Sequence, residues 1–260
     1  MTAQNVMTLA ARRQTFLGCP IDLYTMNETL EVAENAMRRK IPMLHAVVNV
    51  AKLVNMRRDP LLREDVCSSD VISADGMGVV WGARLLGLPI PERVAGIDLM
   101  LAVLRLCGEK GFRPYLLGAR QEVLIRVIDN LKRQYPSLEI AGYRNGYFTP
   151  AEETGVVRLI RDAEPDCLFV GISSPIKERF NRKYSRQIGV PFVMGVGGSF
   201  DVLAGRVRRA PDWAQKAGLE WAYRVVQEPR RMWWRYLRTN AAFLGLLGCE
   251  LARHALRQGH

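Results

Sequence analysis

Short apolar runs alternate with amphipathic segments along the first 205 residues. The runs lie at 43–50 (MLHAVVNV), 70–73, 113–118, 138–143, 166–172 and 190–198 (VPFVMGVGG). Their apolar residues are nearly continuous, as in strands of a parallel sheet that is buried on both faces. The segments between them have helical periodicity, most clearly 121–136. The pattern predicts an α/β fold with a parallel sheet covered by helices on both faces.

The character of the chain changes after residue 205. Residues 206–260 are helical in pattern and rich in Trp, and they hold eleven Lys and Arg against four Asp and Glu. This segment therefore carries +7 of the total net charge of +11. Pro229 should divide it into two helices. We expect a core domain over 1–205 and a basic, amphipathic helical appendage over 206–260.

Composition bears on metals, cofactors and partners. The five cysteines form no C-x-x-C pair and only three histidines occur, so we expect reduced thiols, no metal site and no cofactor. The start of the chain lacks the basic residues of a secretory signal, and no run of about 18 apolar residues occurs to span a membrane. A pI near 9.8 favours anionic partners.

Polar or glycine-rich stretches follow four of the predicted strands, at 49–50, 74–78, 171–178 and 195–201. Ligands of parallel α/β sheets bind beyond the carboxyl ends of the strands. Asp75 is the candidate general base, since a carboxylate can take a proton from a sugar hydroxyl. Gly76 leaves room for substrate beside it. The competing interpretation of Asp75 is a helix-capping residue.

The other candidates each have a structural alternative. Arg93 is suited to a diphosphate, or to a surface ion pair with Glu92 or Asp98. Gly197 and Gly198 suit a phosphate cradle or a tight turn. The stretch SSPIKE offers Ser174, Lys177 and Glu178 to a ligand, or an ordinary helix start with Pro175 at its first position.

Two further features separate enzyme classes. GMGVVWG (76–82) approaches a dinucleotide fingerprint, and Asp98 lies 20 residues past Gly78, but Trp81 stands where the third glycine belongs. A nicotinamide-dependent oxidoreductase is therefore an alternative, with Asp98 as an N-cap in the simpler interpretation. No D-x-D occurs, which favours metal-independent chemistry in which Arg, Lys and backbone N–H groups stabilise a leaving diphosphate.

The appendage combines an apolar stripe with arginines. The stripe consists of Trp233, Leu237, Leu244, Leu247 and Leu251. A basic amphipathic helix with Trp is typical of a membrane interface, so we expect contact with an anionic membrane surface. Simple packing on the core is the alternative, and a non-catalytic peripheral scaffold is a third function. No nucleic-acid-binding motif occurs, and we expect no nucleic-acid partner.

Several motifs together resemble the WecG/TagA/CpsF family of bacterial glycosyltransferases (family 26). In the family's order they are VVNVAKLV (47–54), SADGMGVVWGARLLGLPIPERVAGIDLM (73–100), NGYFTP (145–150), LFVGISSPIKE (168–178), GVGGSFDVLAGRVRRAP (195–211) and GLEWAYRVVQEPRR (218–231). The resemblance implies a Rossmann-like core with a C-terminal helical appendage. It also implies an inverting, metal-independent enzyme that moves a sugar from a UDP-sugar to a polyprenyl-diphosphate-linked saccharide, in surface or exopolysaccharide assembly, peripherally at the cytoplasmic face of the inner membrane.

The resemblance also assigns roles to residues. It places the acidic base on Asp75, the asparagine after the first strand on Asn49 and the motif arginine on Arg93. Appendage arginines that close over the diphosphate correspond to Arg224 and Arg231. Two departures from the family pattern are Val47, where some members have Thr, and Lys177, where many have Gln.

Both departures fall near the expected donor pocket. UDP-glucose, UDP-N-acetylmannosamine and its uronic acid therefore stay open as donors. A homo-oligomer is also expected if the isolated core exposes apolar surface that a second copy covers.

Overall fold

Six parallel strands form the central sheet of the computed structural model, which describes residues 12–258 without the side chains of Lys216, Arg231, Met232, Arg235, Arg257 and Gln258. In sheet order they are β4 (Val71–Ala74), β3 (Met43–Val48), β8 (Phe192–Gly195), β7 (Cys167–Gly171), β5 (Pro114–Gly118) and β6 (Gly142–Arg144). Every neighbouring pair is parallel. The predicted parallel α/β sheet is confirmed.

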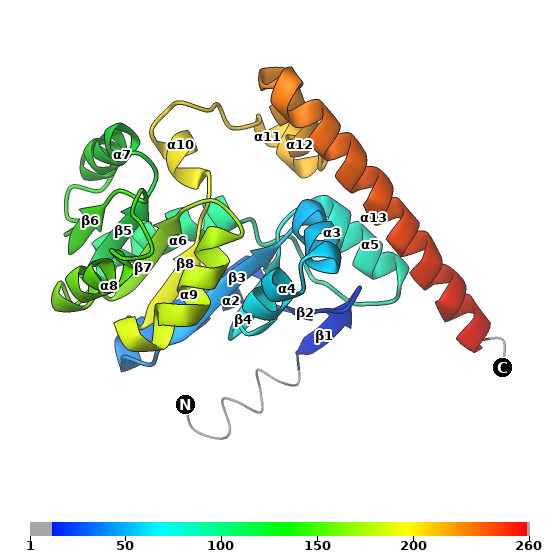
Figure 1. The fold of residues 1–260 in the computed structure, drawn as a ribbon, viewed down its shortest axis with the longest axis horizontal. Coiled ribbons are helices and arrows are strands. Elements are labelled where there is room, and N and C mark those ends of the chain that lie inside the picture. The colour runs from blue at the N-terminus through cyan, green and yellow to red at the C-terminus, as the bar shows by residue number, and fades with distance from the viewer. Residues whose placement is uncertain (1–11, 259–260) are drawn as a thin grey trace.

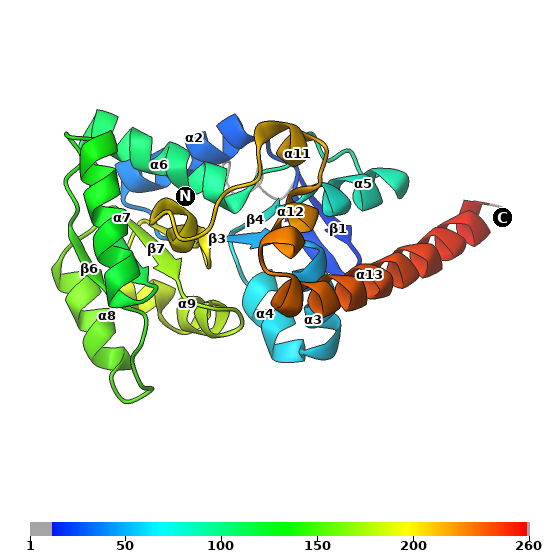
Figure 2. The same ribbon diagram turned by 90° about the horizontal axis from the view of Figure 1, so that it is seen from above.

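Helices cover both faces of this sheet (Figures 1 and 2). One face carries α2 (Met26–Arg39), α6 (Gly96–Lys110) and α7 (Gln121–Gln134), whose apolar sides share a buried cluster. The other carries α4 (Pro60–Cys67), α9 (Ile176–Ile188) and α8 (Glu153–Asp162). In α7 the buried residues are those that the helical period predicts: Val123, Leu124, Val127, Ile128 and Leu131.

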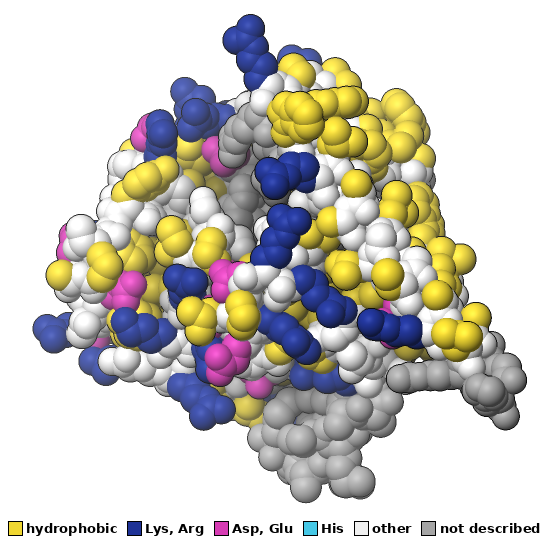
Figure 3. Space-filling model, turned by 45° about the vertical axis from the view of Figure 1, so that its right-hand side comes forward, with side chains coloured by type: hydrophobic (Ala, Val, Ile, Leu, Met, Phe, Trp, Pro, Cys, Tyr) yellow, Lys and Arg dark blue, Asp and Glu magenta, His cyan; other side chains and the backbone are white. Residues whose placement is uncertain are grey.

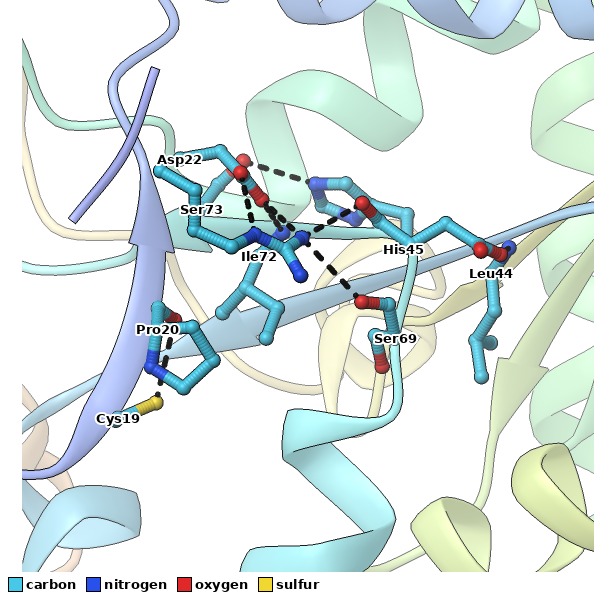
Figure 4. A network of polar contacts seen from close by, with 10 residues as sticks. Cys19, Pro20, Asp22, Leu44, His45, Ser69, Ile72 and Ser73 are labelled. Carbon is cyan, nitrogen blue, oxygen red and sulfur yellow. Dashed lines mark hydrogen bonds and ion pairs between the residues drawn. The ribbon is translucent and has the colours of Figure 1, made fainter. Parts of the chain in front are cut away.

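An N-terminal hairpin, β1 (Arg13–Phe16) and β2 (Cys19–Asp22), protects the edge strand β4 (Figure 4). The Asp22 carboxylate accepts the backbone N–H of Ile72 over 2.7 Å and both N–H groups of the Arg13 fork. On the other side of β4, His45 Nε2 lies 3.0 Å from Ser73 Oγ. The Asp22 side chain thus satisfies the Ile72 N–H, which on an edge strand would otherwise be open to pairing with another chain.

Two parts of this architecture differ from the sequence-based expectation. The hairpin and α4 were not predicted, because each is only four to eight residues long. The run 138–143 contributes only Gly142–Arg144 to the sheet. The Leu138 N–H donates to the Tyr135 carbonyl over 3.0 Å, so the turn that follows α7 takes up the start of this run.

The C-terminal segment forms α11 (Asp212–Lys216), α12 (Glu220–Gln227) and the long α13 (Pro229–Gln258), after the short α10 (Ser199–Leu203). The break at Pro229 is confirmed. Figure 1 shows α13 running beside α3 (Val50–Arg58) and α5 (Met77–Leu85).

The side of α13 that faces the core is small and specific. Phe243 and Leu247 are buried in a cluster with Phe16, close to Gly82 of α5. A Cβ atom at Gly82 would lie 3.0 Å from the Phe243 ring, so the glycine permits this approach. Of the predicted apolar stripe, Leu247 therefore packs on the core, whereas Trp233, Leu237 and Leu244 are exposed. The core interpretation thus holds for Leu247, and membrane contact of the exposed residues stays a prediction.

Candidate active site

The register of the sheet brings Asn49 and Asp75 together. Val48 pairs with Ala74, so the residues that follow them leave the sheet side by side, and the Asp75 N–H donates to the Val48 carbonyl over 2.8 Å. Asn49 caps α3 by accepting the Lys52 N–H at 3.0 Å. Gly76 adopts φ +115°, a conformation that favours glycine, and a Cβ atom there would lie 4.0 Å from that of Asn49.

Asp75 does not cap a helix. The N-cap of α5 is Gly76, and no side chain bonds to the free N–H groups of that helix start. The Asp75 side chain is only partly exposed. The capping interpretation is therefore wrong, and the carboxylate is available for chemistry.

The loop before α6 holds Arg93 beside Asp75. The Val94 N–H donates to the Ala74 carbonyl over 2.9 Å, which pins this loop to the end of β4. Arg93 Nη1 lies 3.0 Å from Glu220 Oε2, and Arg93 Nη2 lies 3.7 Å from Asp98 Oδ2. Only 14% of the Arg93 side chain is exposed, so these ion pairs are more than a surface contact.

Asp98 belongs to the same network. It lies in the first turn of α6, whose N-cap is Ala95, so the expectation that Asp98 caps this helix is wrong. Its carboxylate lies 2.6 Å from Arg209 Nη2, in the segment that leads to the appendage. Arg93, Asp98 and Arg209 thus connect the core with the C-terminal segment. Glu92, the other expected partner of Arg93, instead accepts the Met26 N–H.

The electrostatic surroundings of Asp75 are mixed. Burial and the negative charge of Glu220 raise its pKa to about 6, while the cations Arg93, Lys52 and Arg224 act in the opposite direction. A carboxylic acid with a pKa near 6 is a better base than an exposed one and is still mostly ionised at pH 7. The site therefore holds a carboxylate with a raised pKa near several cations.

Lys177 and Glu178 form a buried cluster with Lys52. Glu178 Oε1 lies 2.6 Å from Lys177 Nζ and 2.9 Å from Lys52 Nζ, and all three side chains are less than 10% exposed. Burial would raise the pKa of Glu178, but the two lysines outweigh it and lower the pKa to about 2. Burial and Lys52 lower the pKa of Lys177 to about 8. Two cations share one anion, so this cluster keeps a positive charge.

The cluster is buried beside Gly195, the last residue of β8, and does not lie on the protein surface. The aliphatic part of Lys177 packs against Gly195, where a Cβ atom would lie 3.1 Å from Lys177 Cε. In the described part of the chain the Lys177 ammonium group is engaged by Glu178. Lys52 was missed by the sequence analysis because it reads as an ordinary position of an amphipathic helix.

The other expected ligand groups lie at neighbouring strand ends. Ser174 is exposed after β7, and Pro175 is the N-cap of α9, one position earlier than predicted. Gly197 has φ +52° and Gly198 precedes α10. A Cβ atom at either glycine would meet nothing within 4 Å, so this loop is open. A role in phosphate binding stays a prediction for these residues.

The appendage reaches the site through a close contact at Gly218. This residue has φ +67°, and a Cβ atom there would lie 2.7 Å from the Trp81 ring and 2.8 Å from Met77 Cβ. The contact seats the start of α12 on α5, and it brings Glu220 and Arg224, one helical turn apart, toward Asp75. Glu220 was missed by the sequence analysis. The side chain of Arg231, the second expected arginine, lies outside the described residues.

The face formed by the appendage is both basic and apolar. Figure 3 shows hydrophobic side chains along its upper and right edges and Lys and Arg side chains across its middle. The exposed large apolar residues of α12 and α13 are Trp221, Val226, Trp233, Trp234, Leu237, Leu244, Leu251 and Leu256. None of the helices within residues 12–258 is long and apolar enough to cross a membrane. The same residues contain no group of three or more His, Cys, Asp or Glu able to hold a metal ion.

Comparison with known proteins decides the class. The Glycosyl transferase WecG/TagA/CpsF family matches residues 14–257, which include the strand-end residues and the appendage. The chain belongs to this family. It is therefore a glycosyltransferase, and the oxidoreductase and scaffold alternatives are wrong.

Two relatives carry the same enzyme name, N-acetylglucosaminyldiphosphoundecaprenol N-acetyl-beta-D-mannosaminyltransferase. The Bacillus spizizenii protein is 38% identical over 178 residues, which cover 68% of each chain. The Bacillus subtilis (strain 168) protein is 37% identical over 171 residues, which cover 66% of this chain and 64% of the relative. Both names describe transfer of a sugar to a lipid-linked diphosphate sugar.

Proposed function

We propose that the protein transfers a sugar from a UDP-sugar to a hydroxyl group of a saccharide carried on a polyprenyl diphosphate. Family membership and the acceptor in the relatives' names support this activity. The observation that carries the proposal is the placement of the Asp75 carboxylate at a strand end, beside Asn49 and within electrostatic range of the cations Arg93 and Arg224. Glycosyl transfer needs both a proton acceptor and positive charge for the leaving diphosphate.

The reaction is a single displacement. The Asp75 carboxylate accepts the proton of the acceptor hydroxyl as its oxygen attacks the anomeric carbon of the donor. The bond from that carbon to the diphosphate oxygen breaks, and UDP leaves with the electron pair. Attack opposite the leaving group inverts the anomeric configuration. Asp75 later returns its proton to solvent.

The leaving UDP gains negative charge in the transition state, and fixed cations stabilise it. Arg93 and Arg224, together with Arg231, take this role. The net positive charge of the Lys52, Lys177 and Glu178 cluster adds to the same field. These groups supply the charge that a bound metal ion supplies in other transferases, so we propose a metal-independent reaction.

The donor sugar distinguishes three versions of the proposal. The relatives transfer N-acetylmannosamine, which favours UDP-N-acetylmannosamine. The departures from the family pattern at Val47 and Lys177 favour a different donor, such as UDP-glucose or the uronic acid of N-acetylmannosamine. Lys177 can pair with the carboxylate of a donor only if it gives up its ion pair with Glu178.

We further propose that the protein acts peripherally on the cytoplasmic face of the inner membrane, in surface or exopolysaccharide assembly. The exposed Trp and Leu side chains of α13, interspersed with arginines, support contact with anionic lipid. Each Lys or Arg near such a surface contributes about 1 kcal/mol. This contact would bring the active site to the lipid-linked acceptor.

A donor panel tests the activity. The full chain is incubated with a polyprenyl-diphosphate-linked N-acetylglucosamine acceptor and each of the three UDP-sugars, with and without EDTA. We expect one donor to give lipid-linked disaccharide and UDP at a rate that EDTA does not change. Loss of activity in EDTA that Mg²⁺ restores would contradict the metal-independent reaction, and no product from a wider set of UDP-sugars would contradict the donor class.

A further inference from the structure

The shortest ion pair of Arg93 is with a residue of the appendage. Glu220 is the first residue of α12, and its Oε2 lies 3.0 Å from Arg93 Nη1. The other carboxylate near Arg93, Asp98, is farther away at 3.7 Å and is engaged by Arg209 at 2.6 Å. Both members of the Arg93–Glu220 pair are more than three-quarters buried, with 14% and 23% of their side chains exposed. Glu220 is thus the main partner of Arg93 in this structure.

A carboxylate and a phosphate compete for a guanidinium group. Both accept the N–H groups of its planar fork in the same geometry, so a diphosphate that binds Arg93 must share or displace the carboxylate. Glu220 also adds a negative charge within range of Asp75, on the side where α12 approaches the strand ends. A donor diphosphate would bring further negative charge into this space, and the repulsion favours displacement.

We propose that Glu220 is an internal competitor for the donor diphosphate. Its carboxylate holds Arg93 in the free enzyme, is displaced when the UDP-sugar binds, and returns to Arg93 as UDP leaves. The inference rests on the proposed function, because it assumes that Arg93 binds the diphosphate. It adds a residue that limits affinity for the donor and assists release of the product.

The position of Glu220 in α12 suits this exchange. Arg224 follows one helical turn later, so a small movement that withdraws Glu220 keeps a cation of the same helix beside the site. The start of α12 is held on α5 through Gly218, so the helix itself stays seated. If Glu220 instead only fixes the rotamer of Arg93 for binding, its removal should weaken the affinity for UDP.

Titration calorimetry of UDP with the full chain separates the two roles. Removing the competing charge in Glu220→Gln should tighten UDP binding by roughly three- to tenfold. Glu220→Asp, which keeps the charge but shortens the reach to Arg93, should give a smaller gain. Arg93→Ala should weaken UDP binding, and adding Glu220→Gln to it should then have little effect. Glu250→Gln, at a partly exposed residue of α13 paired with Arg253, is the matched control and should bind UDP as the wild type does.

Steady-state kinetics give a second readout. Glu220→Gln should lower KM for the donor and, where UDP release limits turnover, lower kcat as well. Unchanged or weaker UDP binding in both Glu220→Gln and Glu220→Asp, with folding verified by circular dichroism, would overturn the inference while leaving the proposed function intact. Failure of the wild type to bind UDP would instead overturn the proposed function, and this inference with it.

Discussion

The backbone N–H of Asp75 donates to the carbonyl oxygen of Val48 over 2.8 Å. This bond continues the pairing of β3 with β4 by one residue beyond the last strand position. It fixes the backbone of Asp75 at the end of the sheet, beside Asn49, while the side chain makes no helix cap. A carboxylate that is held so firmly by its backbone can be replaced without disturbing the fold.

Substitution Asp75→Asn tests the role of the base. We expect kcat to fall by about 10²–10⁴, the usual contribution of general-base catalysis, because the amide cannot accept the proton. UDP binding and the circular dichroism spectrum should change little. Turnover close to that of the wild type would show that another group accepts the proton.

The pH dependence follows from the raised pKa of Asp75. The base acts when ionised, so kcat/KM of the wild type should fall as pH drops through about 6. The charged groups that face Asp75 are Glu220 and Arg224 of α12, Lys52 of α3 and Arg93. Glu220→Gln removes the anion among them, so the acid limb should move to lower pH. A limb that keeps its position in this variant would assign the titration to another group.

The buried cluster predicts a large effect on stability. Glu178→Gln leaves Lys52 and Lys177 without their shared counter-charge, which should cost about 3–5 kcal/mol of unfolding free energy. Glu64→Gln, in an exposed pair with Arg182, is the matched control and should cost about 1 kcal/mol or less. Urea unfolding at pH 7 measures both. Equal, small losses would show that the lysines find other partners.

The cluster of Lys52, Lys177 and Glu178 also makes the unfolding free energy depend on pH in the acid range. The pKa of Glu178 is lowered to about 2, below its value in the unfolded chain, so its stabilising contribution is present above pH 4.5. That contribution should be lost as pH falls from about 4.5 to 2. In Glu178→Gln this part of the acid sensitivity should disappear.

Substitution of Gly218 by Ala should move α12 of the appendage away from the active site. Gly218→Ala introduces strain at φ +67° and a Cβ atom 2.8 Å from Met77 Cβ, which the backbone of α5 holds in place, so α12 must shift away from α5. We expect kcat/KM to fall at least about tenfold, because Arg224 moves with α12. Gly245→Ala, on an open face of α13, is the control and should retain activity. Equal activities would show that the site tolerates displacement of α12.

Membrane contact is best tested by point substitutions. Truncation at residue 206 would also remove Phe243 and Leu247 and expose Phe16 in the core. The double variant Trp234→Ala/Leu244→Ala changes only exposed side chains, and it should sediment less with vesicles that contain anionic phospholipid. Leu159→Ala, an exposed residue of α8 on the opposite side of the molecule, should bind as the wild type does (Figure 1). Equal binding by all three proteins would contradict contact through α13.

The sequence by itself determined the α/β alternation, the parallel sheet and the position of Asp75 beyond a strand end. These features depend on local periodicity and on the glycine at position 76. Both can be read from residues that lie close together in the sequence. It also indicated Arg93 and Arg224 through the family resemblance. The expected capping role of Asp98 was wrong, and Leu247 of the apolar stripe packs on the core, because the partners that other segments provide cannot be read from a local pattern.

The tertiary structure alone decided which distant residues meet. Glu220 reaches Arg93 across 127 positions of the chain, and Arg209 reaches Asp98 across 111. Lys52 joins Glu178 because β3 lies beside β8, which the helix α9 precedes. No local pattern encodes such pairs, since they follow from strand order, register and the docking of α12 on α5. The pKa of Asp75 depends on burial and on the charges that these long-range contacts bring to it.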